Sequence, residues 1–128
     1  MTTAYNPPGW FIRKVMNPLA LRFRLVKSVP LKVPGRTSGE TQELAVTPID
    51  VDGVTYLVSV RGYASWVRNL EAAGGGDLDG RRFSAVLVDV ERAKPVIRAY
   101  RAKVGRSIDP VWNKLPDDAD HPVFALSF

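Results

Sequence analysis

The chain has 128 residues, of which 45% are hydrophobic and 24% charged, so it suits one domain with a sizeable core and excludes global disorder. It contains no cysteine, which excludes disulfides, cysteine-ligated metal sites and a cysteine nucleophile. The formal net charge of +5 favours an anionic partner, such as a phosphorylated cofactor, an acidic lipid surface or nucleic acid.

Residues 1–28 predict an amphipathic N-terminal arm on a single domain that spans residues 1–128. Apolar and basic residues mix along residues 7–27, and Pro18 divides the stretch into two helical pieces. The start lacks the features of a signal peptide, and the following stretch is too charged to span a bilayer. We therefore expect a cytoplasmic protein. The arm has three alternative roles: packing on the protein itself, which is the default, contact with an anionic membrane surface, or a dimer contact.

Extended segments follow the arm. Residues 29–33 predict a short strand, and residues 34–39 are dense in turn-forming types. Residues 43–51 and 54–60 are rich in β-formers and meet at Asp52-Gly53, which predicts a hairpin. Pro48 interrupts the first of these runs, which indicates an edge or bulged position.

Helices and strands alternate in the second half. Ser65 is expected to cap a helix that runs to Ala73 and stops at the glycines 74–76. Residues 82–90 predict a strand buried on both faces, residues 93–104 a helix that stops at Gly105, and residues 122–128 a last strand. Four or five strands with short helices between them predict an α+β fold, either a barrel or a half-barrel.

A basic turn in the middle third is the first candidate site. Gly35-Arg36-Thr37-Ser38-Gly39 lies at the mouth of the predicted hairpin. The glycines let the backbone approach an anion, while Arg36 adds charge and forked donor geometry. In isolation, such a sequence is more often only a turn.

Four segments are informative when they are taken together: Val33-Pro34-Gly35-Arg36-Thr37-Ser38-Gly39, Tyr56-Leu57-Val58-Ser59-Val60-Arg61-Gly62, Trp66-Val67-Arg68-Asn69-Leu70-Glu71-Ala72-Ala73-Gly74 and His121-Pro122-Val123-Phe124-Ala125-Leu126. Together they resemble the deazaflavin-dependent nitroreductase family. The resemblance runs from about Leu31 to the C-terminus. It implies a split β-barrel of the FMN-binding type, with antiparallel strands and short helices. It also implies coenzyme F-420, a deazaflavin, as the non-covalent cofactor, with FMN ranked behind it.

The resemblance also implies roles for single positions. The turn and Gln42 fall where the family holds the phosphate and the acidic tail of the cofactor. Main-chain groups of residues 58–61 fall where the family lines the deazaflavin ring, and the helix after them completes the cleft. The candidate cofactor-binding residues are Arg36, Thr37, Ser38, Gln42, Val58, Ser59, Val60, Arg61, Trp66 and Asn69.

The chain departs from the family at two of these positions. Thr37 and Gln42 are neutral, whereas better-known members often carry basic residues there. Each lost charge-assisted bond should weaken the hold on a polyanionic tail by about 1 kcal/mol or more. The tyrosine-rich substrate lid of the family has no clear match, so the resemblance implies the cofactor more strongly than any substrate.

Alternatives stay open at several residues. Trp66 suits stacking on a ring system and anchoring its helix in the core equally well. Asn69 could make a hydrogen bond within the protein as well as a ligand contact. Arg61 could be a solvated charge at a strand end as well as a cofactor contact. For His121, the only histidine, a structural or solvated role outweighs metal binding, so no metal is expected.

The leading function is an oxidoreductase that passes hydride from reduced coenzyme F-420 to a quinone, a nitroaromatic or another electron-poor acceptor. The cofactor performs this chemistry, which agrees with a sequence in which no catalytic residue is assigned. The alternative is a non-enzymatic carrier or sensor of a lipid or flavin-like ligand. Nucleic-acid binding ranks last because the basic residues form no run and no aromatic-interleaved motif. Analogy with other split barrels suggests a homodimer.

Overall fold

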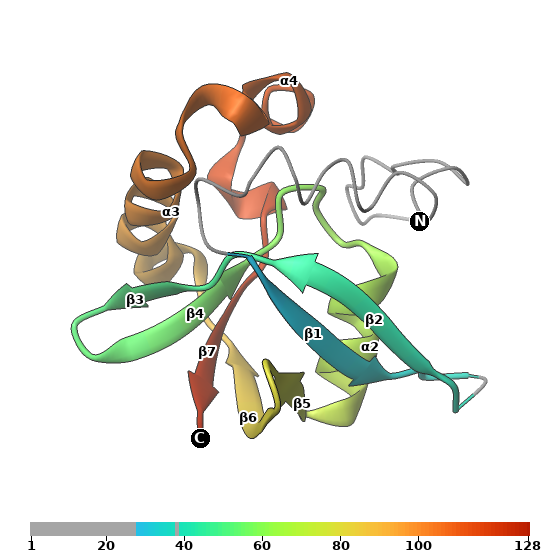
Figure 1. The fold of residues 1–128 in the computed structure, drawn as a ribbon. Coiled ribbons are helices and arrows are strands. Elements are labelled where there is room, and N and C mark those ends of the chain that lie inside the picture. The colour runs from blue at the N-terminus through green and yellow to red at the C-terminus, as the bar shows by residue number, and fades with distance from the viewer. Residues whose placement is uncertain (1–27, 38) are drawn as a thin grey trace.

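A computed structural model describes residues 28–37 and 39–128 (Figure 1). The expectations for the N-terminal arm fall on residues 1–27 and therefore lie outside the described residues, as does the role of Ser38. None of the helices in the described ranges has the length and apolar character needed to cross a membrane.

Seven antiparallel strands form one sheet in the order β2-β1-β5-β6-β7-β4-β3 (Figure 1). The strands are β1 (Val29–Pro34), β2 (Thr41–Val46), β3 (Ile49–Val51), β4 (Val54–Val58), β5 (Gly75–Leu78), β6 (Arg81–Leu87) and β7 (Val123–Ser127). The helices are α2 (Ser65–Ala73), α3 (Val90–Val104) and α4 (Asp109–Trp112), with 3-10 turns at Gly105–Ile108 and Asp118–Asp120.

Two clusters of buried side chains lie on opposite faces of this sheet. Leu57 of β4 and Phe124 of β7 belong to the cluster that α2 covers. Their neighbours Val58 and Val123 belong to the cluster that α3 and α4 cover. Successive side chains of a strand point to opposite faces, so β4 and β7 contribute to both clusters. These two strands are therefore the middle layer of the fold.

The hairpin predicted at Asp52-Gly53 is confirmed. The turn joins β3 to β4, and both residues have positive φ angles, 51° and 79°, which the sharp turn requires. The single strand predicted over residues 43–51 is wrong, because β2 and β3 lie at opposite edges of the sheet. Pro48 lies between them, where its missing N–H costs no ladder hydrogen bond.

The helix predicted after residue 64 is confirmed, but Ser65 does not cap it. Ala64 occupies the N-cap position, and no side chain makes a capping hydrogen bond there. The helix ends at Gly74, which is left-handed with a φ of 74°. Gly75 and Gly76, expected only to stop the helix, instead begin β5. Their glycine-rich sequence carries no strand signal, so the local pattern does not predict this strand.

The strand predicted at residues 82–90 is present as β6, but the prediction that both of its faces are buried is wrong. Strand β6 ends at Leu87, and Asp89 caps α3 by accepting a hydrogen bond from the main-chain N–H of Arg92 at 2.8 Å. Phe83 is buried under α2, whereas Val86, on the other face, is 66% exposed. The reason is that α3 packs against β3, β4 and β7. The last strand and the stop at Gly105 agree with prediction.

Candidate functional site

The predicted basic turn meets α2 through Asn69. The side-chain oxygen Oδ1 of this buried asparagine accepts hydrogen bonds from the main-chain N–H of Arg36 at 3.1 Å and from its Nη1 at 2.7 Å. The amide nitrogen Nδ2 of Asn69 donates to Oε1 of Gln42 at 2.8 Å. Three predicted residues, from the turn, from β2 and from α2, therefore form one hydrogen-bonded network.

Arg36 also reaches the first turn of α2. Its Nη1 lies 3.4 Å from the main-chain oxygen of Ser65 and 3.3 Å from Oγ of that residue. Its Nε and Nη2 donors make no hydrogen bond within the described residues. Because α2 has no side-chain cap, the partial positive charge of its first turn is not neutralised there. A guanidinium with spare donors thus lies beside an uncapped helix N-terminus, an arrangement that favours an anion.

The turn between β4 and α2 places Arg61 at the same end of that helix. Arg61 is half-buried and precedes the helix by four positions. In the same region Nε of Arg68 donates to the main-chain oxygen of Tyr63 at 3.3 Å. Arg36 and Arg61, predicted to bind one ligand, are therefore brought to one end of α2 and not to opposite sides of the molecule.

Ser59 holds this turn in place. Its side chain is fully buried and donates to the main-chain oxygen of Gly62. Its main-chain N–H donates to the oxygen of Pro122 at 3.0 Å, and its carbonyl accepts from Nδ1 of His121 at 2.8 Å. The protein thus uses the polar groups of Ser59 itself, and Val58 is paired with Val123 in the sheet. Of the other two residues in the range 58–61, Val60 is partly buried against the α3 cluster, and Arg61 is half-buried with an interaction partner of its own.

His121 is the part of this support that sequence reasoning did not assign to the site. It is buried, with Nδ1 on the carbonyl of Ser59 and Nε2 on the carbonyl of Leu115. Its ring stacks on Trp112, with 3.5 Å between ring centroids. This is the structural one of its two predicted roles. The signal available in the sequence was its place directly before the last strand.

Trp66 and Thr37 are placed differently from the network. Trp66 is buried in the α2 cluster, where its ring centroid lies 6.2 Å from that of Phe124. This position corresponds to the core-anchor alternative. Thr37 is exposed in the turn. Ser65 contacts Arg36, a role that its place in the sequence does not indicate, because a serine before a helix is typical of a cap.

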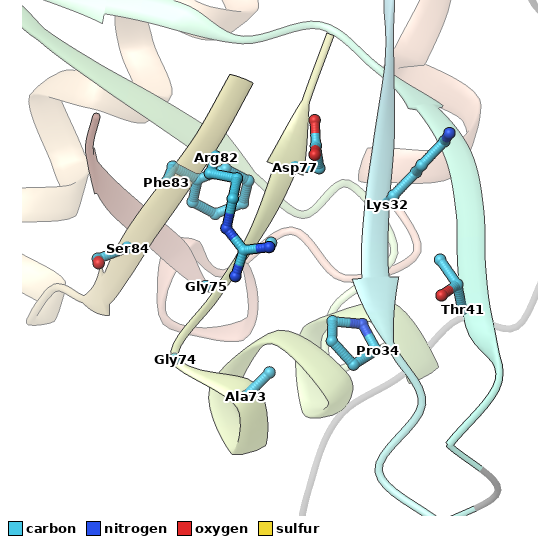
Figure 2. A pocket seen from close by; sticks show the side chains of 11 residues that line it. Lys32, Pro34, Thr41, Ala73, Gly74, Gly75, Asp77, Arg82, Phe83 and Ser84 are labelled. Atoms are coloured by element: carbon cyan, nitrogen blue, oxygen red, sulfur yellow. The ribbon is translucent and has the colours of Figure 1, made fainter. Parts of the chain in front are cut away.

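Two hollows of the described structure lie elsewhere on the molecule. One of about 420 Å³ is lined by residues of β1, β5 and β6, including Lys32, Asp77 and Arg82 (Figure 2). A second of about 370 Å³ adjoins it and shares Lys32 and Asp77. None of the described candidate cofactor residues lines either one. The sheet face that carries these hollows is therefore distinct from the corner at Arg36, by which we mean the turn that contains Arg36 and the N-terminal end of α2 that it contacts.

Comparisons with known proteins bear on the fold. No family model and no curated protein sequence matches the chain. The heme storage protein HutZ from Vibrio cholerae is similar in structure, with a TM-score of 0.59, 18% identity and coverage of 88% of this chain and 89% of that one. An F-420-H2 dependent reductase, FDR-A, has a TM-score of 0.56 at 18% identity, covering 78% of this chain and 93% of that one.

A third similar structure is longer than this chain. It is a protein of unknown function from Agrobacterium tumefaciens, with a TM-score of 0.59 and 17% identity, and the match covers 79% of this chain but 47% of that one. At these identities the comparisons show the fold alone. The fold is a split β-barrel of the flavin-binding type, which confirms the predicted α+β class and antiparallel arrangement.

Proposed function

We propose that this protein binds coenzyme F-420 and passes hydride from its reduced form to an electron-poor acceptor such as a quinone or a nitroaromatic compound. The observation that carries the proposal is the Arg36 guanidinium, held by Asn69 and Ser65 beside the uncapped first turn of α2. The cofactor carries a phosphate and an acidic tail, and this corner offers donors and positive charge of the kind such groups require.

The residues present fit an anionic cofactor. Arg36 keeps Nε and Nη2 for a ligand after binding Asn69 and Ser65. Arg61 adds a second positive charge at the same helix end. When bound, the deazaflavin supplies the hydride. The chain itself binds and orients it: Arg36 and Arg61 hold its anionic part, and Ser59 keeps the turn that carries Arg61 in place.

The comparisons support the proposal at the level of the fold. The FDR-A structure is by its name an F-420-H2 dependent reductase, so this fold accommodates such a function in at least one protein. Fold alone does not select a function, because the same architecture accommodates different ligands. The assignment to F-420 therefore rests on the corner at Arg36 and on the resemblance of the matching segments.

Binding of F-420 can be tested by its fluorescence. We expect saturable quenching when the protein is titrated into F-420, and about tenfold weaker binding in Arg36→Ala and in Arg61→Ala, because each loses charge-assisted hydrogen bonds. Arg98→Ala, which removes an exposed charge on α3, is the matched control and should bind as the wild type. The absence of any saturable change at micromolar protein would refute the proposal.

A second candidate is a non-enzymatic carrier of a flavin-like ligand. Gln42 favours it: this position is neutral, and its amide oxygen is already engaged by Asn69. The similar HutZ structure is by name a storage protein. Turnover separates the two functions. An enzyme should oxidise reduced F-420 when a soluble quinone is added, whereas a carrier should bind a ligand without consuming it.

A further inference from the structure

His121 is a buried titratable side chain whose two ring nitrogens both face carbonyl groups. The residue is 2% exposed, its Nδ1 lies 2.8 Å from the main-chain oxygen of Ser59, and its Nε2 contacts the main-chain oxygen of Leu115. A carbonyl oxygen accepts hydrogen bonds and cannot donate one. Both contacts are therefore hydrogen bonds only when both ring nitrogens carry a proton, which is the imidazolium cation.

The neutral ring cannot satisfy both carbonyls. A neutral imidazole has one N–H and one bare nitrogen, and the lone pair of the bare nitrogen would face the lone pairs of a carbonyl oxygen. Because His121 is buried, water has little access to replace the lost hydrogen bond. Loss of one proton therefore breaks one of the two links that the ring makes.

Trp112 provides a place for the positive charge. Its ring lies parallel to that of His121, with 3.5 Å between the centroids and 5° between the planes. The face of an indole ring attracts a cation. The guanidinium of Arg101 lies 5.1 Å from the centroid of the same indole, but Asp109 pairs with it at 3.2 Å and compensates its charge.

The elements around His121 carry other charged and titratable side chains. They are Arg61 on the turn after β4, Tyr100 and Arg101 on α3, Asp109 on α4, Lys114 after it, and Asp117, Asp118 and Asp120 at the 3-10 turn. Within the described residues none of these carboxylates forms an ion pair with the imidazole. Histidine is the side-chain type that ordinarily changes charge between about pH 5 and 8, and this chain contains only one.

We propose that His121 is a positioning residue that holds the turn of Arg61 as its imidazolium cation, so that cofactor binding depends on the proton of this ring. The hydroxyl of Ser59 donates to the main-chain oxygen of Gly62 and closes the turn that carries Arg61. The protonated ring ties Ser59 to Leu115, and the neutral ring releases one of them. This step rests on the proposed function, because Arg61 acts here only through an anionic cofactor.

The direction of the pH dependence follows from the contacts. The folded protein favours the cation, because only the cation donates to both carbonyls. The stability that the cation supplies is therefore present at low pH and is lost as the pH rises and the ring loses its proton. F-420 binding should weaken in the same direction, since the turn is then less firmly held.

The alternative is a neutral, packed histidine with a single hydrogen bond. NMR of protein labelled with 15N-histidine distinguishes the two, because the single histidine gives one pair of ring nitrogen signals. At about pH 6 we expect a directly bonded proton on each nitrogen, observable because a buried, hydrogen-bonded proton exchanges slowly with water. A bare ring nitrogen in the folded protein at that pH would overturn the proposal. The labelled wild type needs no substitution, so this result does not depend on the stability of a variant.

F-420 binding tests the positioning role. The side chain in His121→Gln does not titrate and donates to only one of the two carbonyls at a time. Between about pH 6 and 9, the F-420 dissociation constant of the wild type should rise about fivefold more than that of the variant, because one hydrogen bond is lost. Any titration of F-420 itself is common to both proteins. Asp120→Asn, which removes the carboxylate next to His121, is the control and should keep the wild-type dependence.

An equal pH dependence in the wild type and in His121→Gln would also overturn the proposal. Absence of F-420 binding at every pH would instead be a failure of the proposed function. In that case the pH dependence of stability decides whether the imidazolium holds the turn: between about pH 6 and 9, the denaturant midpoint of the wild type should fall relative to that of His121→Gln. Parallel midpoints would show that it does not.

Discussion

At the residue scale, the candidate site depends on one buried amide. Asn69 accepts two hydrogen bonds from Arg36 and donates one to Gln42, so it fixes the turn before β2 against α2. An amide is suited to this place because it both donates and accepts. It also adds no negative charge beside Arg36, which keeps the corner attractive to an anion.

Asn69→Asp tests that last point. The carboxylate should keep the bonds from Arg36, and rotation of the Gln42 amide can restore a donor toward it. The added charge should pair with Arg36 and weaken F-420 binding about tenfold, with a change of less than about 1 kcal/mol in the free energy of unfolding. Asn69→Ala is the control for structural loss and should cost about 1–3 kcal/mol of stability. Unchanged F-420 affinity in the aspartate variant would contradict an anion site at Arg36.

Tyr100 gives a prediction on alkaline stability. Burial raises the pKa of this tyrosine from 10.0 to about 12, because desolvation disfavours the phenolate. The pKa of Tyr100 in the folded state lies above its value in the unfolded state. The contribution of Tyr100 to the free energy of unfolding is therefore fully present below pH 10 and is lost as the pH rises toward 12. Over that window the free energy of unfolding should fall by up to about 1.4 kcal/mol per pH unit. In denaturant titrations at several pH values, the free energy of unfolding of Tyr100→Phe should fall less between pH 10 and pH 12 than that of the wild type. An identical fall in the two proteins would contradict the prediction.

At the element scale, the close approach of β1 and β5 depends on glycine. Gly76→Ala would place a Cβ 2.5 Å from the carbonyl oxygen of Lys32, a backbone atom that can move only if the strands separate. We expect a loss of about 3 kcal/mol of stability in chemical denaturation. Ser84→Ala, at an exposed position on β6, is the control and should change it by less than about 0.5 kcal/mol. Equal effects of the two substitutions would show that β1 and β5 are not packed this closely.

The same strand shows where sequence patterns stop being informative. Helix ends, the Asp52-Gly53 hairpin and the last strand follow from local chemistry and are predictable. Strand β5 is not, because its glycines are selected by the neighbouring strands and resemble a helix stop. The split at Pro48 and the exposed outer face of β6 also depend on the order of strands in the sheet, which no local pattern contains.

The candidate site follows the same division. The sequence indicated Arg36, Gln42 and Asn69, and the structure joins them in one network. Because these three residues are far apart in the sequence, the sequence does not show which of their atoms form hydrogen bonds with one another. The support from His121 to Ser59 was equally inaccessible, because it joins residues 62 positions apart through a buried ring.

At the scale of the whole molecule, one sheet connects two cores. Strands β4 and β7 supply Leu57 and Phe124 to the α2 cluster, and Val58 and Val123 to the α3 cluster. Loss of packing in either cluster would uncover one face of these shared strands. We therefore expect the two clusters to unfold together, as small cooperative domains generally do.

Among the described residues each cluster contains one tryptophan, so the protein carries its own fluorescent reporters, and the third tryptophan of the sequence, Trp10, lies outside the described residues. Trp66 lies in the α2 cluster and Trp112 in the α3 cluster. In a variant with Trp10→Phe and Trp112→Phe, fluorescence follows the α2 cluster alone, and in one with Trp10→Phe and Trp66→Phe it follows the α3 cluster. In each variant the denaturant midpoint by fluorescence should equal the midpoint by far-UV circular dichroism, even though the two variants differ in stability. A fluorescence transition that precedes the loss of secondary structure would mean that one helix detaches while the sheet persists, and the cores would then be independent.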